Sequence, residues 1–523
     1  MTLHCSRATP RSAMTILCGL AALAAGGRPG AAEEWSRPAA AHLLRRAGFG
    51  GTPEQIGFLA GLGRTGAVDY LLDIPTDAAG ADRLPIAAFE EPDPQEMRML
   101  PEAERQRLQM DRRRRDLAQL QRIRRQWVDR MITTPRPLEE KMVLFWHGHL
   151  TSGHREVRSS KLLYEQNELF RRYALGNYRT LLLEVCADPA MLLYLNNAQN
   201  VRTAPNENFA RELLELFTLG PGHYSEADIK ETARAFTGWG VDRRTGTFRF
   251  RPRLHDDGVK TVLGVRGRLN GGDVVDIILS RPRAAEHLVE RLWRFFASDD
   301  PPRAVVRRLA AGFRRGRYEL KPLLRAMFRS DAFYAESVLH ARVKSPVELL
   351  VGSMRALEIP PVDTDAFVLG LRLMGQDLFQ PPTVKGWDGG MDWINTATLF
   401  NRYNVTARLI GGTGGRRRGP AAPMSGAAGD DWAMDSNPPP SEPQPPFDPL
   451  PMLRGRGLRR AEDVVDHCVW RLLGRSLPPE RREVLIDAFR RDLRGPDPTA
   501  PQNAGAVRRL LMLIVAMPEY QLS

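Results

Sequence analysis

The chain has 523 residues, of which 42% are hydrophobic and 26% charged, and this composition excludes a largely disordered protein. Its formal net charge of +13 would suit an anionic partner. Only 7 of the 75 basic residues are Lys, and the Arg residues are spread over the whole chain. The charge therefore does not indicate a dedicated nucleic-acid surface, and we expect no specific nucleic-acid partner.

The first 32 residues have the pattern of a signal peptide. Arg7 and Arg11 precede a short apolar run at 13–27, and small residues at 30–32 form a candidate cleavage site before Glu33. The apolar run is shorter than the about 20 residues that span a membrane, and no other run suggests a transmembrane span. We therefore expect an exported protein, periplasmic or secreted. The alternative is a misassigned start followed by a disordered tail.

Beyond residue 32, apolar residues recur mostly at helical spacing, as in 137–146 and 345–357. Strand patterns are rare, and the best one places 247–251 opposite 261–264, with a turn at 255–258. The sequence thus predicts a mainly α fold, a multi-helix globular body with one small β-hairpin insertion.

The same patterns divide the chain into four segments. After the signal peptide at 1–32, we expect a main helical domain at 33–410 and a disordered Pro/Gly-rich insert at 411–455. Helices in 456–523 should pack back on the main body, because this segment is too small to be independent. An Arg-rich stretch at 94–132 is typical of one long helix with a solvated face. Cys186 and Cys468 lie in apolar helical contexts and are expected to be buried thiols.

The stretch PNENFARELLELFTLG at 205–220 carries many polar groups on one short helix. Asn208, Arg211, Glu212 and Glu215 recur at three- and four-residue spacing beside an apolar stripe. One interpretation is a surface ladder of ion pairs, in which Arg211 bridges Glu207 and Glu215. The other is a catalytic pair, Glu212 and Glu215, oriented by Arg211 at the edge of a pocket. Two adjacent carboxylates raise one pKa, as general acid catalysis requires.

Two histidine-containing stretches are candidates for a metal site. In FWHGH at 145–149, a helix end would let His147 and His149 converge, and His is a common metal ligand. His255 and Asp256 would add two ligands for a divalent metal, and Lys260 could close over a substrate. The structural alternatives are an ordinary helix end and a hairpin turn favoured by Asp-Gly.

The stretch QPPTVKGWDGGMDWINT at 380–396 is a candidate sugar-binding segment. Trp387 and Trp393 could stack on a sugar ring, with Asp388 and Asn395 as hydrogen-bonding partners. The alternative is a rigid turn whose Trp side chains fill a helix interface. Asn395 also has the position of an N-cap for the following helix.

Together these stretches resemble a large, uncharacterised bacterial family, domain of unknown function 1800. The resemblance is carried by HLLRRAGFG (42–50), RPLEEKMVLFWHGHLTS (136–152), NENFARELLELFTLG (206–220), YSEADIKETARAFTGW (224–239), HDDGVKTVLG (255–264), KSPVELL (344–350), QPPTVKGWDGGMDWINTATLFNRYN (380–404) and LMLIVAMPEYQ (511–521). It implies a mostly helical, exported bacterial protein. It also implies a partner, an exported sulfatase-like protein encoded nearby. No activity, substrate or catalytic residue comes with it.

Two functions follow from the sequence. The first is a cell-envelope or extracellular binding and assembly protein that acts with a protein partner or a polysaccharide. The second is an exported hydrolase, in its metal-assisted form using a His, Glu and Asp pocket to activate water. Convergence of the four polar stretches on one cleft would favour a single site, and separate locations would favour structural roles.

Overall fold

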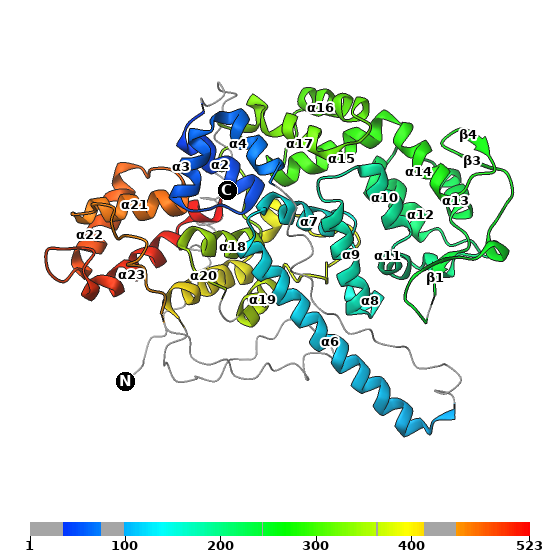
Figure 1. The fold of residues 1–523 in the computed structure, drawn as a ribbon, viewed down its shortest axis with the longest axis horizontal. Helices are drawn as coiled ribbons and strands as arrows, with labels where there is room; N and C mark the ends of the chain where they lie inside the picture. The colour runs from blue at the N-terminus through cyan, green and yellow to red at the C-terminus, as the bar shows by residue number, and fades with distance from the viewer. Residues whose placement is uncertain (1–34, 75–98, 243, 362–363, 413–445) are drawn as a thin grey trace, which may run out of the picture.

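The computed structural model describes residues 35–74, 99–242, 244–361, 364–412 and 446–523. Helices make up most of this part of the chain, and the strands form only two small antiparallel sheets (Figure 1). The predicted mainly α fold is confirmed. The predicted signal peptide at 1–32 lies outside the described residues.

The first half of the chain supplies the centre of the body and the helices around the carboxylate stretch. These elements are α2 (Arg37–Gly48), α3 (Pro53–Gly61), α4 (Gly63–Leu72), α6 (Glu102–Thr133), α7 (Pro137–His149), α8 (His154–Val157), α9 (Ser160–Arg172), α10 (Tyr178–Cys186), α11 (Pro189–Tyr194), η1 (Asn197–Gln199), α12 (Asn208–Glu212), the π-helix η2 (Leu213–Leu219) and α13 (Glu226–Ala235).

The second half begins with the strands and ends with the C-terminal helices. Its elements are β1 (Trp239–Val241), β2 (Phe248–Phe250), η3 (Pro252–Leu254), β3 (Lys260–Val262), β4 (Val265–Gly267), α14 (Gly271–Ser280), α15 (Pro282–Phe296), α16 (Arg303–Arg315), α17 (Leu320–Phe328), η4 (Asp331–Tyr334), α18 (Pro346–Leu357), α19 (Thr364–Leu373), η5 (Gly390–Trp393), α20 (Thr396–Gly411), α21 (Ala461–Leu473), α22 (Pro479–Asp492), η6 (Pro501–Asn503), α23 (Ala504–Val515) and η7 (Pro518–Gln521).

The predicted pairing of the strands is wrong. Strand β2 pairs with β1, where Trp239 lies opposite Phe250, and β3 pairs with β4. Leu263 and Gly264, with φ of 48° and 79°, turn the chain between β3 and β4 in two residues. Two positive φ angles are the geometry of a tight hairpin turn, and closing such a short loop costs little entropy. The β3–β4 hairpin therefore forms instead of the predicted pairing of 247–251 with 261–264. Residues 255–258 are not the turn of a hairpin.

Residues 413–445 of the predicted insert lie outside the described residues. Its last part, 446–455, is described, and Leu450, Met452 and Leu453 are buried there. Burial of these apolar side chains stabilises their packing on the body. From 461 onward, α21 and α23 pack against α18 and α20, and the Tyr520 hydroxyl lies 2.5 Å from the Ser353 hydroxyl.

One large apolar core joins nearly all the helices, and a small second cluster lies beside it. Cys186 and Cys468 are free and buried in the large core, as predicted. Helix α6 begins at Glu102 rather than near 94, and its first half extends away from the body (Figure 1).

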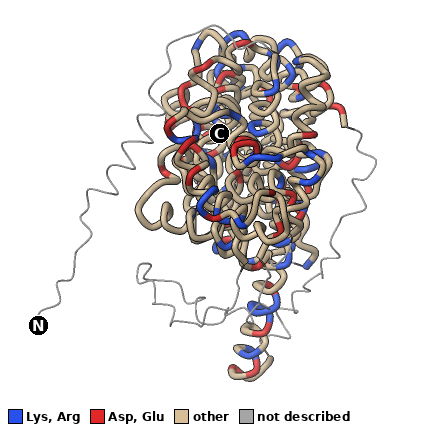
Figure 2. The backbone as a smooth tube through the Cα atoms, turned by 90° about the vertical axis from the view of Figure 1, so that its left-hand side faces the viewer, with Lys and Arg blue, Asp and Glu red and all other residues tan. Residues whose placement is uncertain are grey.

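In the view of Figure 2, Lys and Arg residues are interspersed with Asp and Glu residues along the backbone of the body. Among the described helices, none combines the length and apolar character needed to cross a membrane.

Candidate functional site

The carboxylate stretch contains a rare kind of helix. Helix α12 continues without a break into the π-helix η2, and π-helical turns are frequently found at functional sites. Leu213, Leu214 and Phe217 of η2 are buried in the core. Glu212 and Glu215 lie at the junction and are half-buried, so they face the edge of the body.

Side chains from α7, α10 and α15 hold the C-terminal end of the π-helix. Helix ends leave carbonyl groups without intrahelical donors, and such groups need other partners when buried. Four side chains donate to three of these carbonyls: His149 and Tyr178 to Phe217 (3.1 and 2.9 Å), His287 to Leu216 (3.0 Å) and Arg283 to Leu219 (2.9 Å). His149 therefore anchors the π-helix through its Nε2–H.

The other histidine of FWHGH also binds backbone. His147 Nε2 accepts a hydrogen bond from the backbone N–H of Phe379 at 3.0 Å, so this nitrogen carries no proton. Burial, with a smaller contribution from Arg124, lowers the pKa of His147 to about 3. Burial also holds the pKa of His149 well below its usual value. Both rings are neutral and packed, and each has one nitrogen committed to the backbone.

The stretch 255–260 binds to α13 and the loop that follows it. His255 Nδ1 lies 2.8 Å from the Thr237 carbonyl, and Arg234 donates to Asp256 at 2.8 Å. Lys260 is 1% exposed, and its Nζ donates to the carbonyls of Asp256 and Gly258 at 2.5 and 3.1 Å. These residues fasten the second hairpin to α13. Within the described chain, no three His, Cys, Asp or Glu side chains gather as metal donors.

A tyrosine interacts with each of the two carboxylates. Tyr224 donates its hydroxyl to Glu215, and the charge of Glu212 acts on Tyr194. Burial and then Glu215 raise the pKa of Glu212, while Arg211 and Lys385 oppose the shift. Burial, together with neighbouring carboxylates, raises the pKa of Tyr194 to about 12. The result is a half-buried carboxyl group that takes up a proton more readily than an ordinary Glu.

Arg211 and Asn208 have roles other than orienting this pair. Arg211 makes a bidentate ion pair with Glu226 of α13, at 2.9 Å for both contacts, and reaches Glu207 at 3.6 Å. Its pairing with Glu207 agrees with the ladder interpretation, but Glu226 takes the place expected for Glu215. Asn208 Nδ2 donates to the Leu195 carbonyl at 3.3 Å and ties the start of α12 to the preceding segment.

The loop at 380–395 packs on the end of α7. The ring centroids of Trp387 and His147 are 5.5 Å apart, and a Cβ on Gly386 would stand 2.1 Å from the Gly148 oxygen. Trp393 is 6% exposed and belongs to the small second cluster, so its ring does not face solvent. Asn395 caps α20 through a capping box with Thr398, as predicted.

This loop also supplies two charged groups to the site. Lys385 is exposed and interacts electrostatically with Glu212. Asp388 is also exposed. Burial lowers the pKa of Arg291, and the negative charge of Asp388 partly opposes that shift.

Three of the four polar stretches therefore meet. His149 links α7 to η2, and His147 links α7 to the 380–395 loop. The charge of Lys385, on that loop, acts electrostatically on Glu212. The fourth stretch, with His255, Asp256 and Lys260, finds its partners around α13.

Sequence reasoning missed the groups that complete this arrangement. Tyr178, Arg283 and His287 sit in ordinary amphipathic helices, and no spacing marks them as partners of the π-helix. Their acceptor carbonyls lie 39, 64 and 71 residues away in the chain, respectively. Tyr224 could have been considered, because it opens one of the stretches that carry the family resemblance.

The fold and site define a class: a mainly helical protein with a half-buried carboxylate pair on a π-helix junction. The chain belongs to the family described as "Protein of unknown function (DUF1800)", whose model matches residues 42–522. Comparison with the curated proteins gave no match, and comparison with the solved structures gave none.

Proposed function

We propose that this chain is an exported binding or assembly protein whose binding surface is the carboxylate surface. We define that surface as Glu212, Glu215, Tyr194, Tyr224 and Lys385. The observation that carries the proposal is the hydrogen bond from Tyr224 to Glu215 beside the half-buried Glu212 at the π-helix junction. Lys385 and Tyr194, from two other segments, interact electrostatically with Glu212.

The anchoring of the π-helix supports a binding role. His149, Tyr178, His287 and Arg283 fix the helix from its buried side, so the carboxylates on its outer side are held in place before any ligand arrives. Preorganised groups lose less entropy on binding and so contribute more affinity. Carboxylate acceptors beside tyrosine and lysine donors suit a ligand rich in hydroxyl or amino groups, such as a polysaccharide or a polar segment of the sulfatase-like partner.

Binding is tested with the double variant Glu212→Gln/Glu215→Gln against soluble polysaccharides and the co-expressed sulfatase-like protein. The matched control is Glu483→Gln/Asp487→Asn, which removes two exposed carboxylates from α22. We expect the double variant to lose at least about tenfold in affinity, since one lost charged hydrogen bond contributes about 1.5 kcal/mol. Equal affinity in the double variant, or a wild-type chain that binds none of these ligands, would overturn the proposal.

Export is tested separately, because the proposal rests there on the sequence pattern alone. Expression of the full chain in a bacterial host should release a protein outside the cytoplasm that begins at Glu33. Removal of residues 1–32 should keep the protein in the cytoplasm. A full-length chain retained inside the cell would contradict export. It would leave the proposed binding role of the carboxylate surface untouched.

A second candidate function is an exported hydrolase that works without a metal. The raised pKa of Glu212 beside Glu215 favours it, because acid–base hydrolysis of glycosides uses two carboxyl groups with separated pKa values. Glu212 would donate the proton to the leaving group, and Glu215, held by Tyr224, would act as the base or nucleophile. Turnover of oligosaccharides that falls at least about a hundredfold in Glu212→Gln would support this function over simple binding.

A further inference from the structure

The sheet formed by β1 and β2 has one face against the body and one face with exposed aromatic side chains. Because side chains alternate along a strand, Gly240 and Arg251 lie on the same face. A Cβ on Gly240 would collide with Arg251 Nη2, which donates to a carbonyl of η1 at 2.7 Å. Trp239, Phe248 and Phe250 lie on the other face, which we call the aromatic face.

The aromatic face is open to solvent and held in place by neighbouring rings. Phe248 is 37% exposed and Phe250 is 43% exposed. The Phe248 ring meets Trp239 edge to face at 5.2 Å, and Trp239 packs on the buried Phe236 at 5.0 Å. The Phe250 ring meets His255, which is fastened to the loop after α13, edge to face at 5.4 Å. Such contacts are favourable, and rings fixed before a ligand arrives lose little entropy on binding.

The size of the aromatic face argues against a protein partner. An aromatic side chain has about 150–250 Å² of surface, so Phe248 and Phe250 together expose only about 160 Å². A stable protein interface buries about 800 Å² on each partner. Addition of a partner strand is also unfavourable, because β2 has three residues and Pro252, which lacks a backbone N–H, follows soon after it.

Polar groups border the aromatic rings. Thr247, directly before Phe248, is exposed, and its hydroxyl lies 2.7 Å from that of Thr245. Asp257 is exposed, and its Oδ1 lies 4.0 Å from Nε2 of His255, the ring that contacts Phe250. Apolar rings with hydroxyl and carboxylate groups at their edge match a sugar, whose C–H face stacks on the rings while its hydroxyls form hydrogen bonds.

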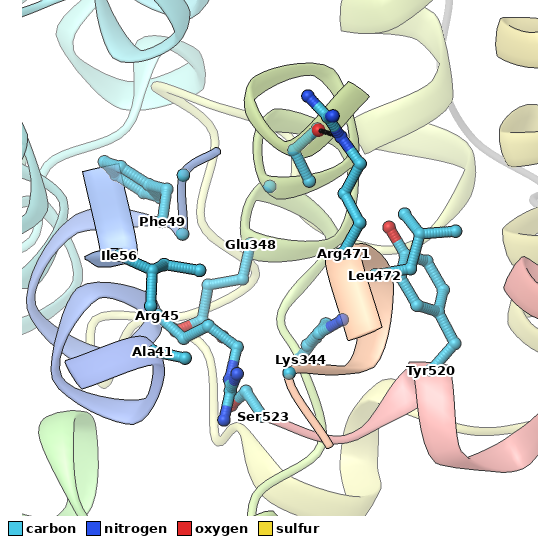
Figure 3. Close-up of a pocket in the computed structure, with 15 residues that line it drawn as sticks. Ala41, Arg45, Phe49, Ile56, Lys344, Glu348, Arg471, Leu472, Tyr520 and Ser523 are labelled. Carbon is cyan, nitrogen blue, oxygen red and sulfur yellow. Dashed lines mark hydrogen bonds between the residues drawn. The ribbon is translucent and has the colours of Figure 1, made fainter. Parts of the chain in front are cut away.

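A sugar does not fit the enclosed pocket between α2, α18 and α21 (Figure 3). That pocket has a volume of about 30 Å³, and one water molecule needs about 10–15 Å³ by this measure. It therefore holds about two waters, whereas the aromatic face is open.

We propose that the aromatic face binds a chain of β-linked glucose or N-acetylglucosamine, with Phe248 and Phe250 stacking on its sugar rings. The ring substituents of these sugars are equatorial, so each ring presents a flat face of C–H groups. Side chains two positions apart on a strand are about 7 Å apart, which is comparable with one sugar unit. Strand β1 packs against α11, which ends at Tyr194 of the carboxylate surface (Figure 1). The proposal does not rest on that surface.

The test measures binding of cellohexaose, laminarin and chitohexaose to the full chain by calorimetry. We expect the wild type to bind at least one of them, and Phe248→Ala/Phe250→Ala to lose at least about tenfold in affinity. Phe248→Tyr/Phe250→Tyr keeps both rings and should keep the affinity. Thermal denaturation checks that each variant is folded, which we expect because both side chains are exposed.

Phe58→Ala/Tyr70→Ala is the matched control. These rings on α3 and α4 are also exposed, and they also pack edge to face, at 5.1 Å. The control should bind like the wild type.

The proposal is overturned if the wild type binds none of the three carbohydrates, or if Phe248→Ala/Phe250→Ala binds them as tightly. A wild-type dimer that this variant abolishes, without carbohydrate binding, would make a second copy the occupant and would also overturn it. Glu212→Gln/Glu215→Gln separates the two surfaces. Loss of affinity only in the Phe variant supports the aromatic face and not the carboxylate surface, and loss only in the Glu variant does the reverse.

Discussion

His149 donates its Nε2–H to the carbonyl oxygen of Phe217 at 3.1 Å, and this bond joins the end of α7 to the end of the π-helix. Tyr178 donates to the same oxygen from α10 at 2.9 Å. Two donors on one buried carbonyl indicate that the end of the π-helix is fixed by side chains rather than by its own hydrogen bonds.

A double-mutant cycle should detect this shared acceptor. His149→Phe keeps the ring volume, and Tyr178→Phe removes only a hydroxyl, so each should cost about 1 kcal/mol while the other donor remains. The double variant removes both side-chain donors to the Phe217 oxygen and should cost at least about 1 kcal/mol more than the sum. Chemical denaturation of the four proteins gives the values. Simple additivity would show that the two donors act independently.

His287 should make the protein sensitive to acid. Burial lowers the pKa of His287 to about 4 from the ordinary 6.5, so the unfolded chain binds more protons between those values. The stability is fully present above pH 6.5 and is lost as the pH falls towards 4, by up to about 3 kcal/mol at 1.36 kcal/mol per pKa unit.

His287→Gln tests this sensitivity, because Gln can still donate to the Leu216 carbonyl but does not titrate. The variant should lose less stability than the wild type between neutral pH and about pH 4.5, as measured by urea midpoints. His223→Gln, at an exposed position, is the matched control. An unchanged pH dependence in His287→Gln would assign the acid sensitivity to other groups, His147 first.

Gly386→Ala should detach the 380–395 loop from α7. Gly386 has φ of +80°, and a Cβ there would meet the Gly148 oxygen at 2.1 Å. Gly375 has φ of +94°, and a Cβ there would have nothing within 4 Å, so Gly375→Ala carries only the backbone strain of about 1 kcal/mol. We expect Gly386→Ala to lower the stability by at least about 2 kcal/mol more than Gly375→Ala. Similar Tm values for the two variants would show that the 380–395 loop shifts to accommodate the added Cβ without loss of stability.

Arg211→Met should have little effect on stability. Arg211 and Glu226 are 37% and 68% exposed, and ion pairs at such positions contribute at most about 1 kcal/mol because water and salt screen them. Thermal denaturation at low and high salt measures the contribution, which should shrink as salt is added. A larger loss, unaffected by salt, would mean that Arg211 has a packing role that its exposure does not suggest.

The sequence alone determined the class of fold and several local features. Helical periodicity predicted the mainly α body, and the Asn395 cap and the buried Cys186 and Cys468 followed from local patterns. Such features depend on residues within about one or two helical turns, where spacing and side-chain chemistry are sufficient. The polar groups of 205–220 were also visible in the sequence.

Only the tertiary structure decided what those groups contact. His147 and His149 bind backbone atoms of Phe379 and Phe217, which lie far away in the chain, and no local spacing encodes such pairs. Periodicity tells which face of a helix is buried, but the partner of a buried polar group depends on which helices meet, and that is settled by packing of the whole core.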